Sequence, residues 1–131
     1  MYGQNGARMT VTLSFYSRVM LSQIIGNYPA ANLKQASVYI RILDKMRITD
    51  PEVAATGMVV KDSRIHWELP SPDYGDKEVS FEIEEAAAIV VALDNSPLPI
   101  KIGDAVWMTK LVDDLSPKPV LVGAPELAKA Y

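Results

Sequence analysis

The chain of 131 residues has a net charge of −3, no cysteine and a single histidine, His66. This composition excludes a disulfide framework, a cysteine nucleophile and a cysteine-ligated zinc site, and it leaves any Ser-His-Asp triad dependent on His66. No apolar run approaches the ~18 residues that span a bilayer, so we expect one cytoplasmic domain without a membrane segment.

Residues 1–9 show no periodicity and are expected to form a flexible lead. Apolar residues then recur at helical spacing from Leu13 to Ile24, which predicts a first helix. Either Thr12 or Ser14 would cap its start, because both side chains can accept a hydrogen bond from a free backbone N–H.

A second helix is predicted over residues 31–47, and it would form an αα-hairpin with the first. Its inward face is expected to be an apolar stripe made of Leu33, Ala36, Ile40 and Leu43. Its solvated face carries the basic residues Lys34, Arg41 and Lys45. The segment 49–57 predicts a short third helix, which Thr49 or Asp50 would cap and Gly57 would end.

A β-hairpin is predicted near residues 58–68. Alternation along its second strand would turn Ile65 and Trp67 toward the core and His66 and Glu68 toward water. The latter two could form an acid–base pair, but a general base also needs a positioned substrate and an orienting partner, and the sequence indicates neither. We therefore interpret the pair as the polar face of the hairpin.

Residues 77–81 predict a third strand and residues 82–95 the most strongly marked helix. Ser80 would cap this helix, and its eight apolar positions at 86–93 predict burial on nearly every side. A last helix is predicted near 103–115. The elements together predict an α+β fold, with about four helices packed on a small antiparallel sheet.

No metal or cofactor site is indicated. Asp73, Asp76 and Glu78 are spaced like a cation-binding loop but lack the glycine and distal glutamate of an EF-hand. No glycine-rich phosphate loop occurs either. We therefore expect no cofactor, no metal and no enzymatic activity, and we assign no catalytic residue.

The charge distribution raises the question of nucleic acid. Residues 1–50 carry six basic and two acidic side chains, whereas residues 51–131 carry seven basic and fourteen acidic ones. The predicted order of elements is that of a winged helix, with Lys61 and Arg64 at the wing. The short third helix, however, has no basic or amide side chain to read bases, and an acidic protein is poorly suited to phosphate contacts. DNA binding is therefore an alternative and not the leading hypothesis.

The domain is expected to span residues 10–115 and to be followed by a proline-punctuated tail at 116–131. The tail contains an apolar stretch at 120–122, which would form an exposed patch if it stayed in water. We expect it to dock on its own domain or to add as a strand to another chain, and we favour the contact across chains. The candidate interaction residues are Arg41, Lys45, Val120, Leu121 and Val122.

A resemblance to small uncharacterised phage and prophage proteins runs over about residues 10–115, through the segments LSFYSRVMLSQIIG, LKQASVYIRILDKMRITDPEV, GMVV, RIHWE and KEVSFEIEEAAAIVVAL. It implies a small accessory protein of the phage type, in the cytoplasm of a host cell. The lack of a catalytic constellation and the two-signed charge favour a protein that acts by binding a host or viral protein, and we expect this binding to inhibit a host defence or regulatory factor. The resemblance carries no catalytic residues to transfer. The alternatives are a virion or assembly component, a role compatible with a homo-oligomer, and a winged-helix-like DNA-binding protein.

Overall fold

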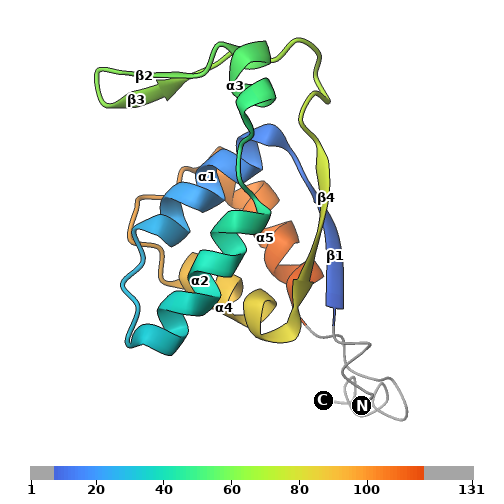
Figure 1. Ribbon diagram of the computed structural model, residues 1–131. Coiled ribbons are helices and arrows are strands. Elements are labelled where there is room, and N and C mark those ends of the chain that lie inside the picture. Colours follow the sequence, from blue (N-terminus) through green and yellow to red (C-terminus); the bar gives the residue numbers. More distant parts are fainter. Residues whose placement is uncertain (1–7, 117–131) are drawn as a thin grey trace.

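The computed structural model describes residues 8–116, which form an α+β domain of five helices and four strands (Figure 1). In chain order these elements are β1 (Arg8–Leu13), α1 (Phe15–Gly26), α2 (Leu33–Lys45), α3 (Asp50–Thr56), β2 (Val59–Lys61), β3 (Arg64–His66), β4 (Lys77–Glu82), α4 (Ile83–Asp94) and α5 (Ile102–Leu115). The expected fold class is confirmed. Within the described part of the chain, no helix is long and apolar enough to cross a membrane.

β1 and β4 form an antiparallel ribbon that runs along one side of the helices (Figure 1). Its register places Met9 opposite Phe81 and Val11 opposite Val79, so alternate side chains from both strands enter the core. The strand at 77–81 was predicted, with Val79 and Phe81 inward, and this is confirmed.

The partner of that strand was not predicted. Arg8 and Met9 were expected in the flexible lead, but both lie in β1, so the prediction was wrong for these two residues. Leu13 was assigned to the first helix because its spacing from later apolar residues is helical. It also continues the alternation of Met9 and Val11, and the structure places it in β1. Ser14 separates strand from helix, because its side chain accepts a hydrogen bond from the Ser17 backbone N–H at 3.0 Å and caps α1.

The β2–β3 hairpin stands apart from this ribbon. Its strands pair only with each other among the described residues, and Figure 1 shows the hairpin projecting from the end of the molecule near α3. The two turn residues, Asp62 and Ser63, have φ values of 54° and 62°, as a tight two-residue hairpin turn requires. Trp67 follows β3 and lies half-buried, with its ring centroid 5.5 Å from Phe15 and 5.9 Å from Tyr16.

We expect Trp67→Ala to lower the free energy of unfolding by about 2 kcal/mol, below the cost for a fully buried aromatic because this side chain is only partly buried. His66→Ala serves as the matched control. Its side chain is exposed, so the change should stay within about 0.5 kcal/mol. Urea unfolding of both variants checks this. Equal effects would show that Trp67 does not anchor the hairpin.

The inward face of α2 differs from the predicted stripe. Leu33 and Ile40 are 81% and 63% exposed, whereas Tyr39, Ile42 and Met46 are buried. The prediction chose the wrong one of two overlapping apolar stripes. The buried stripe is favoured because it turns basic side chains of α2 toward the glutamates at the start of α4.

The burial predicted for α4 was also too extensive. Ile83 and Val91 are 49% and 43% exposed and Ala87 is exposed as well, because no described element covers this side of the helix. Ser80 does not cap α4. It lies in β4, where its hydroxyl contacts that of Thr10, and Glu82 occupies the cap position.

Candidate functional site: an apolar groove between α4 and α5

His66 and Glu68, the one acid–base pair considered from the sequence, are both exposed. No other described residue makes a side-chain hydrogen bond to either of them. The Glu68 backbone N–H is occupied, since it donates to the carbonyl of Thr56 at 2.9 Å and ties the hairpin to α3. Among the described residues, the pair therefore has no orienting side-chain partner, which a general base needs.

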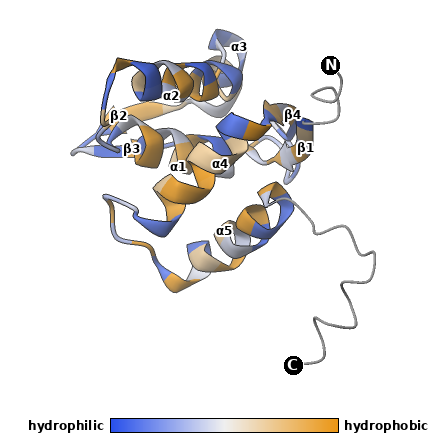
Figure 2. Cartoon of the chain, turned by 90° about the horizontal axis from the view of Figure 1, so that it is seen from below, coloured by the Kyte–Doolittle hydropathy of each residue, from blue (hydrophilic) through white to orange (hydrophobic). Residues whose placement is uncertain are grey.

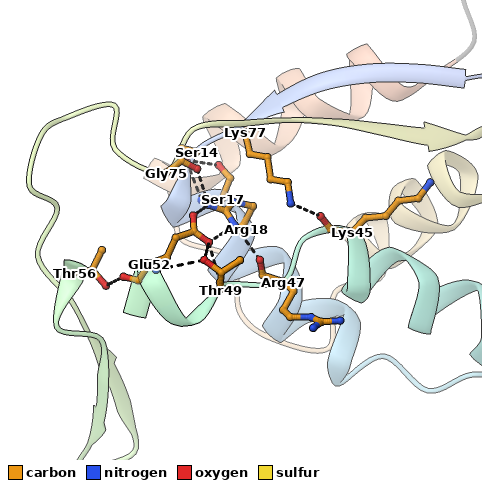
Figure 3. Close-up of polar contacts among 10 residues, drawn as sticks. All are labelled: Ser14, Ser17, Arg18, Lys45, Arg47, Thr49, Glu52, Thr56, Gly75 and Lys77. Carbon is orange, nitrogen blue, oxygen red and sulfur yellow. Dashed lines mark hydrogen bonds and ion pairs between the residues drawn. The ribbon is translucent and has the colours of Figure 1, made fainter. Parts of the chain in front are cut away.

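Arg18 forms a polar cluster that the sequence analysis did not single out (Figure 3). Its side chain is fully buried and makes a two-pronged ion pair with Glu52 of α3. It also donates to the carbonyl of Arg47 at 3.1 Å and to that of Gly75 at 2.6 Å. One guanidinium thus joins α1, the α2–α3 connection and the loop before β4.

This cluster is closed and holds the chain together. Gly75 has a φ of 86°, and a Cβ there would lie 2.9 Å from Cβ of Phe15, so the backbone approaches α1 as only glycine allows. Thr49 adds a hydrogen bond from its backbone N–H to Glu52, within the capping box of α3. Because the guanidinium of Arg18 is fully buried and bonded to three separate segments of the chain, we interpret the cluster as structural. The sequence did contain one signal of this cluster: Arg18 is a charged residue among the regularly spaced apolar residues of the first helix.

Because of this cluster, the stability of the fold should depend on pH in the acid range. The hydrogen bond from Arg18 lowers the pKa of Glu52 from 4.5 to about 2. A lowered pKa in the folded state contributes stability that is complete above about pH 4.5 and is lost as the pH falls toward 2. We expect urea midpoints of the wild type to fall through this window. Glu52→Gln should be less stable at neutral pH, with a difference from wild type that shrinks as the pH falls, and a constant difference would contradict the assignment.

Tyr16, Trp67 and Trp107 form an aromatic row across the hairpin loop, α1 and α5. Asp104, in the first turn of α5, accepts hydrogen bonds from the Tyr16 hydroxyl at 2.5 Å and from the Trp107 ring N–H at 3.3 Å. The first of these bonds raises the pKa of Tyr16 to about 12. The polar tips of two rings are thereby satisfied within the fold, and the row fixes α5 against α1.

An apolar surface that no other described element covers lies between α4 and α5. Two hollows follow one another along this helix pair, with volumes of about 230 and 260 Å³. The first is lined by Leu93, Asp94, Ile100, Ala105, Met108, Thr109 and Val112. The second is lined by Met9, Ile83, Ala87, Val90, Val91, Leu115 and Ser116. We call the two hollows together the α4–α5 groove.

The groove arises because both helices carry more apolar residues than the core covers. Positions 83, 87, 90 and 94 form one stripe of α4, since residues three or four apart share a helix face. On α5, Ile102 and Val106 adjoin the groove and are 83% and 71% exposed. Figure 2 shows α5 at one side of the molecule, with hydrophobic colour on it and on the helices that it faces.

Acidic residues outnumber basic ones on the two helices that form the groove. The two helices and their capping residues carry two lysines, Lys101 and Lys110, and seven acidic residues: Glu82, Glu84, Glu85, Asp94, Asp104, Asp113 and Asp114. Of these charged residues, only Asp94 lines one of the two hollows. Glu84 and Glu85 pair with basic side chains of α2. Asp104 is buried and bonded to aromatic side chains. Among the described residues, no group of three or more acidic or histidine side chains is placed to hold a metal ion.

Arg41 and Lys45, two of the predicted interaction residues, belong to α2. Their side chains contact the first turn of α4 and do not line the groove. Arg41 pairs with Glu84 and Glu85, and the Lys45 ammonium lies 2.5 Å from a carboxylate oxygen of Glu85. The remaining predicted interaction residues, Val120, Leu121 and Val122, lie outside the described residues. The groove was not predicted from the sequence. The exposed stripe of α4 is hidden within an unbroken apolar run, so only the packing reveals which side stays uncovered.

Family models, curated proteins and solved structures were compared with this chain, and none of them matches it.

Proposed function

We propose that this protein is a small accessory protein of the phage type, which binds a host protein through the α4–α5 groove and inhibits it. The phage assignment is supported by the sequence resemblance over about residues 10–115. The binding role is supported by one observation above the others: no described residue fills the two successive apolar hollows between α4 and α5. Apolar surface of this kind on a small domain marks an interaction site.

The shape and charge of the groove define the partner that would fit. A channel between two antiparallel helices accepts the apolar side of an amphipathic helix or an extended apolar segment. The carboxylate of Asp94 at the first hollow favours a partner with a lysine or arginine beside its apolar side chains. Each aliphatic side chain that leaves water for a hollow would contribute roughly 1.5–3 kcal/mol.

A pair of matched variants tests the proposal. Ile83 lies in the groove and Ile40 lies on the outer face of α2, and both are exposed isoleucines within helices. The tagged protein and its Ile83→Asp and Ile40→Asp variants are incubated with bacterial host lysate, and bound molecules are identified by mass spectrometry and nucleic-acid staining.

We expect one host protein to be captured by the wild type and by Ile40→Asp, and to be lost with Ile83→Asp. Circular dichroism of each variant controls for folding. Capture that is insensitive to Ile83→Asp would contradict the groove. Capture of DNA that is released by moderate salt would support the winged-helix alternative, and capture of virion proteins alone would support the assembly alternative.

A further inference from the structure

The α4–α5 groove begins where the described chain ends. Ser116 lines the second hollow and follows α5 directly. The next residues read Pro117-Lys118-Pro119-Val120-Leu121-Val122. This segment has the chemistry that the apolar hollows favour, because it carries three consecutive aliphatic side chains. The question is whether the segment can reach the hollows along the helix pair.

The length of the segment after Ser116 matches the distance from Ser116 to the first hollow. Proline-rich backbone extends by about 3.1 Å per residue, so residues 120 to 122 lie up to roughly 12–19 Å from Ser116. Along α5, Thr109 and Ala105 lie seven and eleven residues before Ser116, or about 10–17 Å at the helical rise of 1.5 Å per residue. A segment that turns back after Ser116 and follows the groove therefore brings residues 120–122 level with the first hollow.

The C-terminal segment of the same chain should occupy the groove in preference to the segment of a second molecule. A short tether holds its segment near the groove at an effective concentration on the order of millimolar, far above that of a second molecule in dilute solution. We infer that residues 120–122 of the chain's own C-terminal segment occupy the α4–α5 groove. This places the docking of the tail on the same chain, in contrast to the contact across chains favoured from the sequence. Its functional consequence rests on the proposed function: a host partner must displace the segment to bind.

The absence of cysteine from the sequence allows a direct test on the full chain. An Ala124→Cys variant carries one nitroxide spin label just beyond the docking segment, and NMR records which backbone amides it broadens. We expect broadening at Thr109, Val112 and neighbouring positions of the groove. Adding Leu121→Asp should abolish this broadening, whereas the matched change Leu127→Asp, in the same tail, should preserve it.

A mixed sample separates the two possible sources of the segment. Spin-labelled protein without isotopes is mixed with isotope-labelled protein without a spin label, so that any broadening comes from another molecule. Broadening confined to the unmixed sample supports docking within one chain. Broadening in the mixed sample would assign the segment to a second copy, and no broadening of groove residues in either sample would overturn the inference altogether.

A binding measurement then distinguishes this inference from the proposed function. A groove that is covered for about nine-tenths of the time binds its partner about tenfold more weakly. Leu121→Asp should therefore tighten binding of the captured host protein about tenfold, with Leu127→Asp as the unchanged control. If Ile83→Asp loses the partner but Leu121→Asp does not tighten it, the tail inference fails while the proposed function stands. If the tail docks but no partner depends on Ile83, the proposed function fails instead.

Discussion

Replacing Arg18 with methionine is expected to lower the free energy of unfolding by about 3–5 kcal/mol, the cost of removing one partner from a buried ion pair. The guanidinium is fully buried and Glu52 is only 15% exposed, so the carboxylate would be left without its cation. The carbonyls of Arg47 and Gly75 would lose their donors as well. Urea unfolding measures the change.

Two controls make this prediction specific. Arg64→Met removes an exposed arginine of the hairpin and should stay within about 0.5 kcal/mol. In a double-mutant cycle, Glu52→Gln should cost much less in the Arg18→Met background than in the wild type, because the two side chains act as one unit. Additive effects, or a loss no larger than that of Arg64→Met, would contradict the role assigned to Arg18.

Glu85→Gln is expected to lower the free energy of unfolding by about 2–3 kcal/mol, since hydrogen bonds to charged groups contribute more than neutral ones. Glu85 is 1% exposed and accepts from Lys45 at 2.5 Å, from Arg41 at 3.1 Å and from the Glu82 backbone at 2.9 Å. Burial alone would raise its pKa, but the bonds from Lys45, Glu82 and Arg41 outweigh burial and hold the pKa below its usual value.

The neighbouring Glu84 provides the control for Glu85. Its side chain is 54% exposed and pairs with Arg41, which is itself 45% exposed. An ion pair between exposed side chains contributes little, so Glu84→Gln should change the stability by less than about 1 kcal/mol. Thermal unfolding of Glu84→Gln and Glu85→Gln under the same conditions measures the difference between them. A larger loss for Glu84→Gln than for Glu85→Gln would show that α2 and α4 are not joined through the buried carboxylate.

Local signals in the sequence predicted most of the elements. Ser14 caps α1 and Thr49 caps α3, as expected from their ability to bind free N–H groups, and Gly57 ends α3 with a φ of 66°. Pairing between distant segments was not predictable in the same way. The strand at 8–13 is short, and its last residue, Leu13, also fits the apolar spacing of the helix that follows. Its pairing with β4 depends on contacts between distant segments, which no local pattern contains.

The candidate site was even less predictable from local sequence patterns than the pairing of the strands. Ala87 and Val91 belong to an apolar stretch that resembles a fully buried helix, and burial on one side only is decided by where α5 packs. Arg18 was likewise hidden, because its charge is compensated by Glu52, which lies 34 residues further along the chain. The sequence predicted the polar face of the hairpin well, since alternation in a strand is a local property.

The most direct measurement of the central claim is site-specific photo-crosslinking in bacterial host cells. A photoreactive amino acid replaces Thr109 in the groove, Ile40 on the outer face of α2 or Arg64 on the hairpin, all of which are exposed. We predict a crosslink from position 109 to one host protein, through an apolar segment flanked by basic residues, with no such product from position 40 or 64. Crosslinks to that protein from position 40 or 64 but not from position 109 would contradict the account, because its binding surface would then lie outside the α4–α5 groove.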